Sequence, residues 1–148
     1  MNVFVDTNVL VYARDARSLD KQVRAREWME RLWGSRQGRL SFQVLQEYYV
    51  VVTQKLDPSL ARSEARHEIG LLTAWDPIEL DRDVLEAAWL VEDQHRLSWW
   101  DALIVAAAHA SGCRYLLSED YSDGREMDGL LVVDPFRHEP GSVIRDAV

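Results

Sequence analysis

The chain has 148 residues, with 17 lysines and arginines against 25 aspartates and glutamates, and so a formal net charge of −8. Hydrophobic residues make up 47% and charged residues 28%, as in an ordinary globular protein, so we expect residues 1–148 to form one domain. Cys113 is the only cysteine, which excludes an intramolecular disulfide and a thiolate zinc site. The apolar runs are too short for a membrane helix and the N-terminus lacks a signal-peptide pattern, so we expect a cytoplasmic protein with no membrane contact.

The acidic charge is unevenly distributed along the chain. Residues 1–70 contain 11 basic and 9 acidic side chains, whereas residues 71–148 contain 6 and 16. A pI near 4.9 argues against strong non-specific adhesion to nucleic acid, because phosphate neutralisation supplies most of that affinity. The first half still allows a basic face beside an acidic one, although a solvated amphipathic helix is the simpler interpretation of its basic run.

The first half of the chain alternates short apolar runs with segments of helical periodicity. Asn2–Val5 is a β-branched apolar run that ends at Asp6, as expected of a buried strand followed by a polar turn. Apolar spacing, glycines beyond a helix end and a proline suited to a first helical turn indicate the helices. In chain order we expect a strand at 2–5, a helix at 20–33, a strand at 39–41, and helices at 43–55 and 58–73.

The second half continues the alternation of strands and helices. Here we expect a strand at 77–80, helices at 81–95 and 98–110, and strands at 114–117 and 130–133. Strands separated by helices need crossover connections, which produce a mostly parallel sheet with helices on both faces. The sequence therefore predicts an α/β three-layer sandwich whose central sheet has about five short strands.

Acidic residues directly follow two of the predicted strands. Asp6 follows the first strand, and Asp120 lies just past the strand at 114–117, with Asp123 three residues further on. The carboxyl ends of parallel strands share one edge of a sheet, where ligands bind in such folds, so we expect these acids to lie close together. Each also has a structural alternative: Asp6 as a turn former or helix cap, and the other two as solvated loop residues.

Two further acids interrupt apolar stripes on predicted helices. Glu47 lies among valines at helical spacing, and Asp101 begins the apolar helix at 98–110. A carboxylate in such a stripe must be paired, hydrogen-bonded, metal-bound or protonated. A bridge to an arginine would also explain Glu47, and a capping box with Ser98 would also explain Asp101.

Convergence of these acids would itself demand a cation or protons. Two unit charges about 5 Å apart repel by roughly 3 kcal/mol at an effective dielectric of about 20. Four clustered acids make several such pairs, a cost comparable with the whole stability of a domain, about 5–15 kcal/mol. Carboxylate oxygens suit Mg²⁺ or Mn²⁺, and the four histidines follow no spacing that would favour zinc.

Four motifs in the chain resemble, in order, those of the PIN-domain ribonucleases, most of all the VapC-type toxins of toxin–antitoxin systems. They are FVDTNVL at 4–10, SFQVLQE at 41–47, SWWDALIVAAA at 98–108 and LSED at 117–120. The resemblance covers nearly the whole chain. It implies a PIN-like fold and a metal-dependent endoribonuclease that hydrolyses RNA phosphodiester bonds with Mg²⁺ or Mn²⁺.

The resemblance also implies roles for individual residues and partners. The acidic pocket, both catalytic and metal-binding, would consist of Asp6, Glu47, Asp101 and Asp120, with Asn8 and Ser118 in support. Asp123 is the second candidate for the fourth acid, and we favour Asp120 because it is closer to the strand end. The implied partners are an RNA substrate, a small antitoxin protein and a second copy of the chain in a homodimer.

Two other functions are compatible with the residues. A PIN-like binding or scaffold module would keep the fold, although a retired site has no physical reason to retain repelling carboxylates. A Mg²⁺-dependent phosphotransferase acting through an aspartyl phosphate could also use Asp6, but its second acid is missing because position 8 is asparagine.

Trp99 and Trp100 stand directly before the acid at 101. They are either packing residues or platforms on which RNA bases stack. Because successive helix positions point about 100° apart, we expect only one of the two to be accessible.

Overall fold

The computed structural model describes residues 1–144, so the last four residues of the expected 1–148 domain lie outside the described part. In chain order the longer elements are β1 (Asn2–Val5), α1 (Thr7–Tyr12), α2 (Leu19–Ser35), β2 (Gly38–Arg39), α3 (Phe42–Val50), α4 (Arg62–Leu72), α5 (Arg82–His95), α6 (Trp99–Ala110), β3 (Cys113–Leu117), β4 (Glu126–Met127) and β5 (Leu130–Val133). A π-helical stretch, η1 (Val51–Lys55), continues α3, and two 3₁₀ turns are η2 (Thr73–Trp75) and η3 (Pro140–Ser142).

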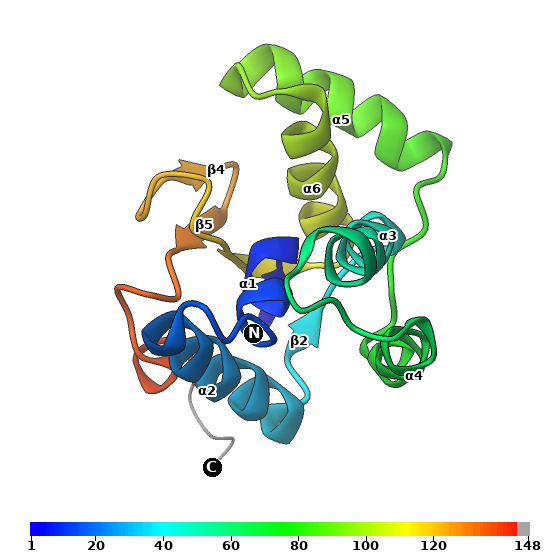
Figure 1. Ribbon diagram of the computed structural model, residues 1–148. Coiled ribbons are helices and arrows are strands. Elements are labelled where there is room, and N and C mark those ends of the chain that lie inside the picture. The colour runs from blue at the N-terminus through cyan, green and yellow to red at the C-terminus, as the bar shows by residue number, and fades with distance from the viewer. Residues whose placement is uncertain (145–148) are drawn as a thin grey trace.

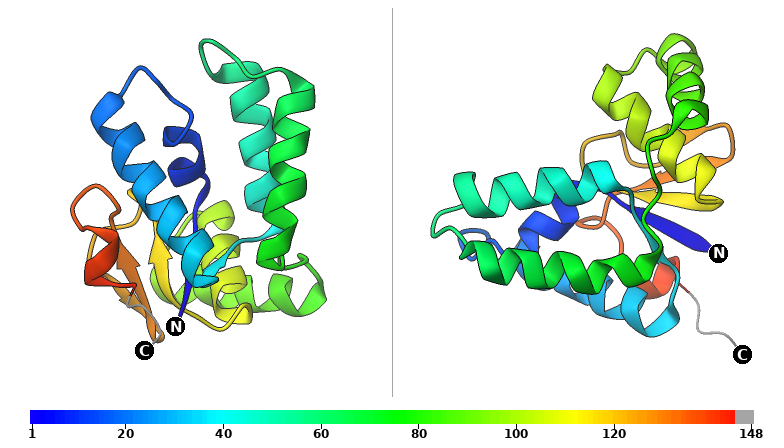
Figure 2. Two further views of the ribbon diagram at one scale, coloured as in Figure 1. Left: turned by 90° about the horizontal axis from the view of Figure 1, so that it is seen from below. Right: turned by 90° about the vertical axis from the view of Figure 1, so that its right-hand side faces the viewer.

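The strands form one five-stranded sheet in the order β2-β1-β3-β5-β4, parallel except for β4. Helices α5 and α6 lie on one side of this sheet and α2 lies on the other (Figure 1). Helices α3 and α4 run side by side as a pair beyond the β2 edge (Figure 2). The predicted α/β sandwich with a mostly parallel sheet is therefore confirmed.

The register of the three central strands aligns their carboxyl ends. Val5 at the end of β1 pairs with Leu117 at the end of β3, which in turn pairs with Val133 at the end of β5. The residues that follow these strands therefore emerge next to one another at a single edge of the sheet. They are Asp6, Ser118 and Asp134.

The core explains why the central strands are apolar at almost every position. Strands of a parallel sheet covered on both faces bury both sets of side chains, and Phe4 and Leu116 are both 0% exposed. On α6 the whole run 102–108 is buried between α5 on one side and β3 and β5 on the other, so this helix shows little amphipathic pattern. No helix within residues 1–144 is both long enough and apolar enough to span a bilayer.

The predicted strand at 77–80 is wrong. Ile78 forms only an isolated parallel bridge with Ser41, and the fifth strand of the sheet is instead the two-residue β4, antiparallel to β5. Pro77 has no N–H to donate, so this segment cannot extend a ladder beyond that bridge. The predicted helix start at Pro58 is also too early, since α4 begins at Arg62.

Gly38 in β2 lies so close to the Trp75 ring that a larger side chain there should destabilise the fold. A Cβ atom at Gly38 would lie 2.7–2.8 Å from three ring atoms of Trp75, whose ring is buried and packs 5.0 Å from that of Trp33. We expect Gly38→Ala to lower the free energy of unfolding by about 1–3 kcal/mol, as overpacking does. Gly34→Ala in α2 is the matched control, because its Cβ meets nothing within 4 Å. Urea titration should show destabilisation for the first variant only; equal values would contradict the contact.

Candidate active site

Asp6 lies at the centre of the polar groups at the sheet edge. It caps α1, where its Oδ1 accepts the Thr7 N–H at 2.7 Å, and its Oδ2 accepts the Ser118 hydroxyl at 2.8 Å. Burial raises the pKa of this carboxyl to about 7; the hydrogen bonds from Ser118 and Thr7 oppose the rise, and the charges of Asp120 and Glu47 add to it. Asp6 is thus the cap of α1, as the structural alternative expected, and also a buried acid at the sheet edge.

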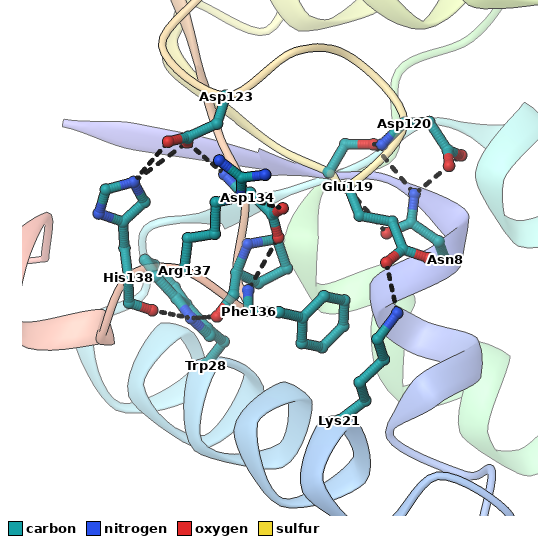
Figure 3. A network of polar contacts seen from close by, with 12 residues as sticks. Asn8, Lys21, Trp28, Glu119, Asp120, Asp123, Asp134, Phe136, Arg137 and His138 are labelled. Atoms are coloured by element: carbon teal, nitrogen blue, oxygen red, sulfur yellow. Dashed lines mark hydrogen bonds and ion pairs between the residues drawn. The ribbon is translucent and has the colours of Figure 1, made fainter.

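Asn8 joins Asp6 to the loop after β3, and Figure 3 shows its contact with Asp120 in that loop. Its Nδ2 donates to Asp6 Oδ2 at 3.3 Å, to Ser118 Oγ at 2.9 Å and to Asp120 Oδ2 at 3.1 Å. Since one amide nitrogen reaches both acids, these two carboxylate oxygens lie within two hydrogen-bond lengths of each other. The pKa of Asp120 is also raised, mainly by burial and further by the charges of Glu119 and Asp101.

Glu47 approaches the same region from α3. Its Oε2 accepts the Thr7 hydroxyl at 2.7 Å, and its Oε1 accepts Gln43 Nε2 at 2.8 Å. Both donors are neutral, and no arginine within residues 1–144 bridges to Glu47, so that alternative is not seen in the described part of the chain. These donors orient the Glu47 carboxylate, and no cation among the described residues forms an ion pair with it.

Asp101 occupies the first turn of α6. Its N–H donates to Ser98 Oγ at 3.3 Å, which confirms that Ser98 caps this helix. The buried Tyr121 hydroxyl donates to the Asp101 carbonyl oxygen at 3.2 Å and lies 3.5 Å from its Oδ1. The pKa of Tyr121 is raised chiefly by burial and then by the charges of Asp6, Asp101 and Asp120, so all three acids lie within electrostatic reach of this hydroxyl.

Asp123 points away from this region (Figure 3). Its carboxylate oxygens contact His138 Nε2 at 2.9 and 3.1 Å, and its Oδ1 accepts the Asp134 N–H at 2.9 Å. The hydrogen bond from Asp134 holds the pKa of Asp123 below its usual range, and His138 contributes in the same direction. Asp123 therefore ties its loop to the segment after β5, while Asp120 adjoins Asp6.

The donor set at the sheet edge suits a hard divalent cation. Within residues 1–144, no three or more Asp, Glu, His or Cys side chains are grouped so that they could hold a metal ion, so the four predicted acids do not converge on one point. Mg²⁺, however, usually retains several waters and takes only one or two carboxylates. Asp6 and Asp120, which share Asn8 as a donor, can supply two oxygen ligands, and the raised pKa of both acids indicates a site that favours added positive charge.

Several residues of this region were not predicted. Thr7 and Gln43 orient the Glu47 carboxylate. Thr7 directly follows Asp6, and Gln43 lies one helical turn before Glu47, so their positions could have indicated this role. Lys21 could not have been found from spacing, because its partners lie far from it in the sequence or are aromatic rings. Its Nζ lies 2.8 Å from Glu119 Oε2 and over the rings of Tyr12 and Phe136, 4.6 and 4.9 Å from their centroids. This ion pair at the rim of the site raises the pKa of Lys21.

Comparison with known proteins agrees with the motifs. The family model for the PIN domain matches residues 3–125. Comparison with curated protein sequences gives no significant match.

Three solved structures share the fold. A toxin–antitoxin complex from Klebsiella pneumoniae superposes with a TM-score of 0.66 at 21% identity, covering 94% of this chain and 99% of that one. VapC20 of Mycobacterium tuberculosis, a toxin that cleaves the sarcin–ricin loop, gives 0.60 at 22% identity, covering 80% and 92%. VapBC2 from Rickettsia felis, bound to a DNA fragment from its promoter, gives 0.58 at 16% identity, covering 89% and 97%. The PIN domain model matches most of this chain, which shows that the chain belongs to the PIN domain family.

Proposed function

We propose that this protein is a Mg²⁺- or Mn²⁺-dependent endoribonuclease and the toxin of a toxin–antitoxin pair. The observation that carries the proposal is the buried carboxylate of Asp6, linked through Asn8 to Asp120 and within the electrostatic reach of Glu47. Membership of the PIN domain family supports a nuclease, and the similar structures from Klebsiella, Mycobacterium and Rickettsia come from toxin–antitoxin systems.

The side chains at the sheet edge have distinct tasks in this proposal. Asp6 and Asp120 would hold the cation, and Asp6 would do so in its deprotonated form, because metal ligands must be deprotonated. Glu47, oriented by Thr7 and Gln43, and Asp101 would add negative charge beside them. The bound cation would polarise the scissile phosphate and lower the pKa of an attacking water. Asn8 and Ser118 keep the two binding carboxylates in register.

The arrangement disfavours an aspartyl-phosphate mechanism. Both Asp6 oxygens already accept hydrogen bonds from Thr7 and Ser118, and the side chain at position 8 is an amide donor rather than a second acid. A non-catalytic scaffold remains the contrasting function, and the following experiment separates the two.

The direct test is incubation of the purified protein with total cellular RNA and Mg²⁺ or Mn²⁺, followed by mapping of new 5′ ends. We expect discrete new ends that EDTA abolishes and that are absent with Asp6→Asn. A protein that leaves RNA intact with either metal, while folded by circular dichroism, would exclude the nuclease and favour the scaffold.

The two acids after β3 should differ sharply in their effect. Asp120→Asn removes a proposed ligand and is expected to reduce RNA cleavage by more than the 10–100-fold that loss of an outer-shell partner costs. Asp123→Asn affects only the contacts with His138 and Asp134, so its cleavage rate should fall by no more than about 10–100-fold. Initial rates on one RNA substrate measure both variants. A larger loss for Asp123→Asn would reverse the assignment of the fourth acid.

A small antitoxin and a second copy of this chain are the protein partners that we propose. An apolar pocket of about 300 Å³ between α1, α2 and α4, with Met29, Trp33 and Leu71 in its wall, supports a protein partner. Sedimentation of the purified chain, alone and co-expressed with the product of any neighbouring gene, tests both partners. A monomer that forms no complex would contradict them.

A further inference from the structure

A second pocket, distinct from the acid cluster but bordering it, lies between α3, the segment before α5 and the start of α6. Its volume is about 380 Å³, within the range of small-molecule sites, and its wall consists of Gln43, Gln46, Glu47, Leu80 and Trp100. Glu47 belongs both to the wall of this pocket and to the acid cluster. A group bound in the pocket would therefore lie beside a phosphate held at Asp6 and Asp120.

Trp100 gives the pocket an exposed aromatic face. It is 64% exposed, whereas its neighbour Trp99 is half-buried and packs against Trp89 with ring centroids 6.5 Å apart. The expectation that only one of the two tryptophans is accessible is confirmed, and the accessible one is Trp100. Its backbone is fixed in the first turn of α6, where its carbonyl oxygen accepts Gln43 Nε2 at 3.3 Å.

The polar wall of the pocket contains an unsatisfied acceptor. Gln43 is 5% exposed, and its Nε2 must face Glu47 Oε1 and the Trp100 carbonyl because both are acceptors. Its Oε1 is thereby left with no hydrogen-bond donor within the described residues and is itself buried. Buried acceptors in native proteins almost always have a partner, so a small shift of this side chain toward the pocket would let its oxygen accept an N–H or O–H group from an occupant. The exposed amide of Gln46 adds a donor and a second acceptor.

The charge of the protein restricts how it can hold RNA. With a net charge of −8 and four acids at the site, long-range attraction to phosphate supplies little affinity. Stacking of a base on an aromatic ring requires no charge and is worth about 1–3 kcal/mol per base. The only charged side chain that this wall presents to a peptide is Glu47. A nucleobase, in contrast, can stack its π-face on Trp100 and donate its N–H groups to the glutamines.

We propose that this pocket binds one unpaired nucleobase of a single-stranded RNA, stacked on Trp100 and facing the amides of Gln43 and Gln46, next to the phosphate that is cleaved. The inference deepens the proposed function and rests on it. The pocket then supplies both the affinity that the acidic surface lacks and a preference for the base flanking the cut.

The test measures binding of a short fluorescent single-stranded RNA in the Asp6→Asn background with Mg²⁺ present, where cleavage is not expected. Trp100→Leu should weaken binding by about 5- to 150-fold, and Trp100→Phe, which keeps an aromatic face, should retain most of the affinity. Trp89→Leu is the matched control, because Trp89 is 51% exposed but lies on α5 away from the pocket, and it should bind as the parent does. Thermal melting of each variant confirms folding.

Unchanged RNA affinity in Trp100→Leu would overturn the pocket assignment. If this variant also sediments as a monomer where the parent is a dimer, the face around Trp100 is a protein interface instead. Cleavage by the otherwise wild-type chain separates this failure from failure of the proposed function. If the wild type cuts RNA and Trp100→Leu cuts at the same sites with the same affinity, only the nucleobase pocket is wrong. If the wild type does not cut RNA with either metal, the nuclease itself is wrong.

Discussion

Asp6→Asn is expected to abolish RNA cleavage while leaving the protein folded. The substitution keeps an oxygen to accept the Thr7 N–H, so the cap on α1 survives, although the new amide no longer accepts from Ser118 and Asn8 as Asp6 Oδ2 does. It removes the negative charge that the cation needs, which should cost at least about 100-fold in rate, more than an outer-shell change. Initial cleavage rates with Mg²⁺ and with Mn²⁺ measure the effect.

Glu79→Gln is the control for this substitution, because Glu79 is exposed and outside the polar network around Asp6. Its cleavage rate should equal that of the wild type. Cleavage by Asp6→Asn at the wild-type rate would exclude Asp6 as a ligand.

The stability of the metal-free protein is expected to fall as the pH rises from about 4 to about 7. Asp6 has a pKa of about 7 in the folded protein against an ordinary aspartate value of 3.8, so the folded state holds this proton more tightly than the unfolded state. The stabilisation is complete below the unfolded pKa and is lost as the pH rises through the folded one. A difference of this size corresponds to about 4 kcal/mol, and the raised pKa of Asp120 acts in the same direction.

Urea titrations in EDTA across this pH range measure the effect. The wild type should lose stability with rising pH, and Asp6→Asn, which has no proton to lose at this position, should lose much less and be the more stable of the two above pH about 7. Added Mg²⁺ should restore stability to the wild type, by about 2.7 kcal/mol at a concentration 100 times its Kd. Parallel pH profiles for the two proteins would show that Asp6 titrates normally.

The sequence predicted the central part of the sheet and placed the β2 edge at 39–41 instead of Gly38–Arg39, but it missed β4. Strands β1, β3 and β5 are continuous apolar runs because they are covered on both faces, and this pattern is visible without a structure. The edge strands β2 and β4 have two residues each, and only pairing with a neighbour makes them strands. Helix α1 was missed because Asp6 and the two polar residues after it were interpreted as a turn.

Asp6 and Asp120 could be placed from the strand ends, and Glu47 and Asp101 from the apolar stripes that they interrupt, but the contacts between these residues and their partners could not. Asn8 reaches Asp120 across 112 residues of sequence and Thr7 reaches Glu47 across 40, and nothing local to either residue indicates its partner. The choice between Asp120 and Asp123 depended on the same kind of contact, since His138 holds Asp123 away from the cluster. Spacing therefore supplied the candidate residues, and the sheet register determined which of them meet.

Titration of Mn²⁺ into the metal-free protein, followed by the electron paramagnetic resonance signal of free Mn²⁺, tests most directly whether the carboxylates act as one cation site. We expect the wild type to suppress the free signal, and Asp6→Asn and Asp120→Asn each to require a clearly higher protein concentration for the same suppression, with Glu79→Gln unchanged. If the wild type leaves the free Mn²⁺ signal intact, or if both aspartate variants bind Mn²⁺ as tightly as the wild type, the gathered acids do not form a metal site.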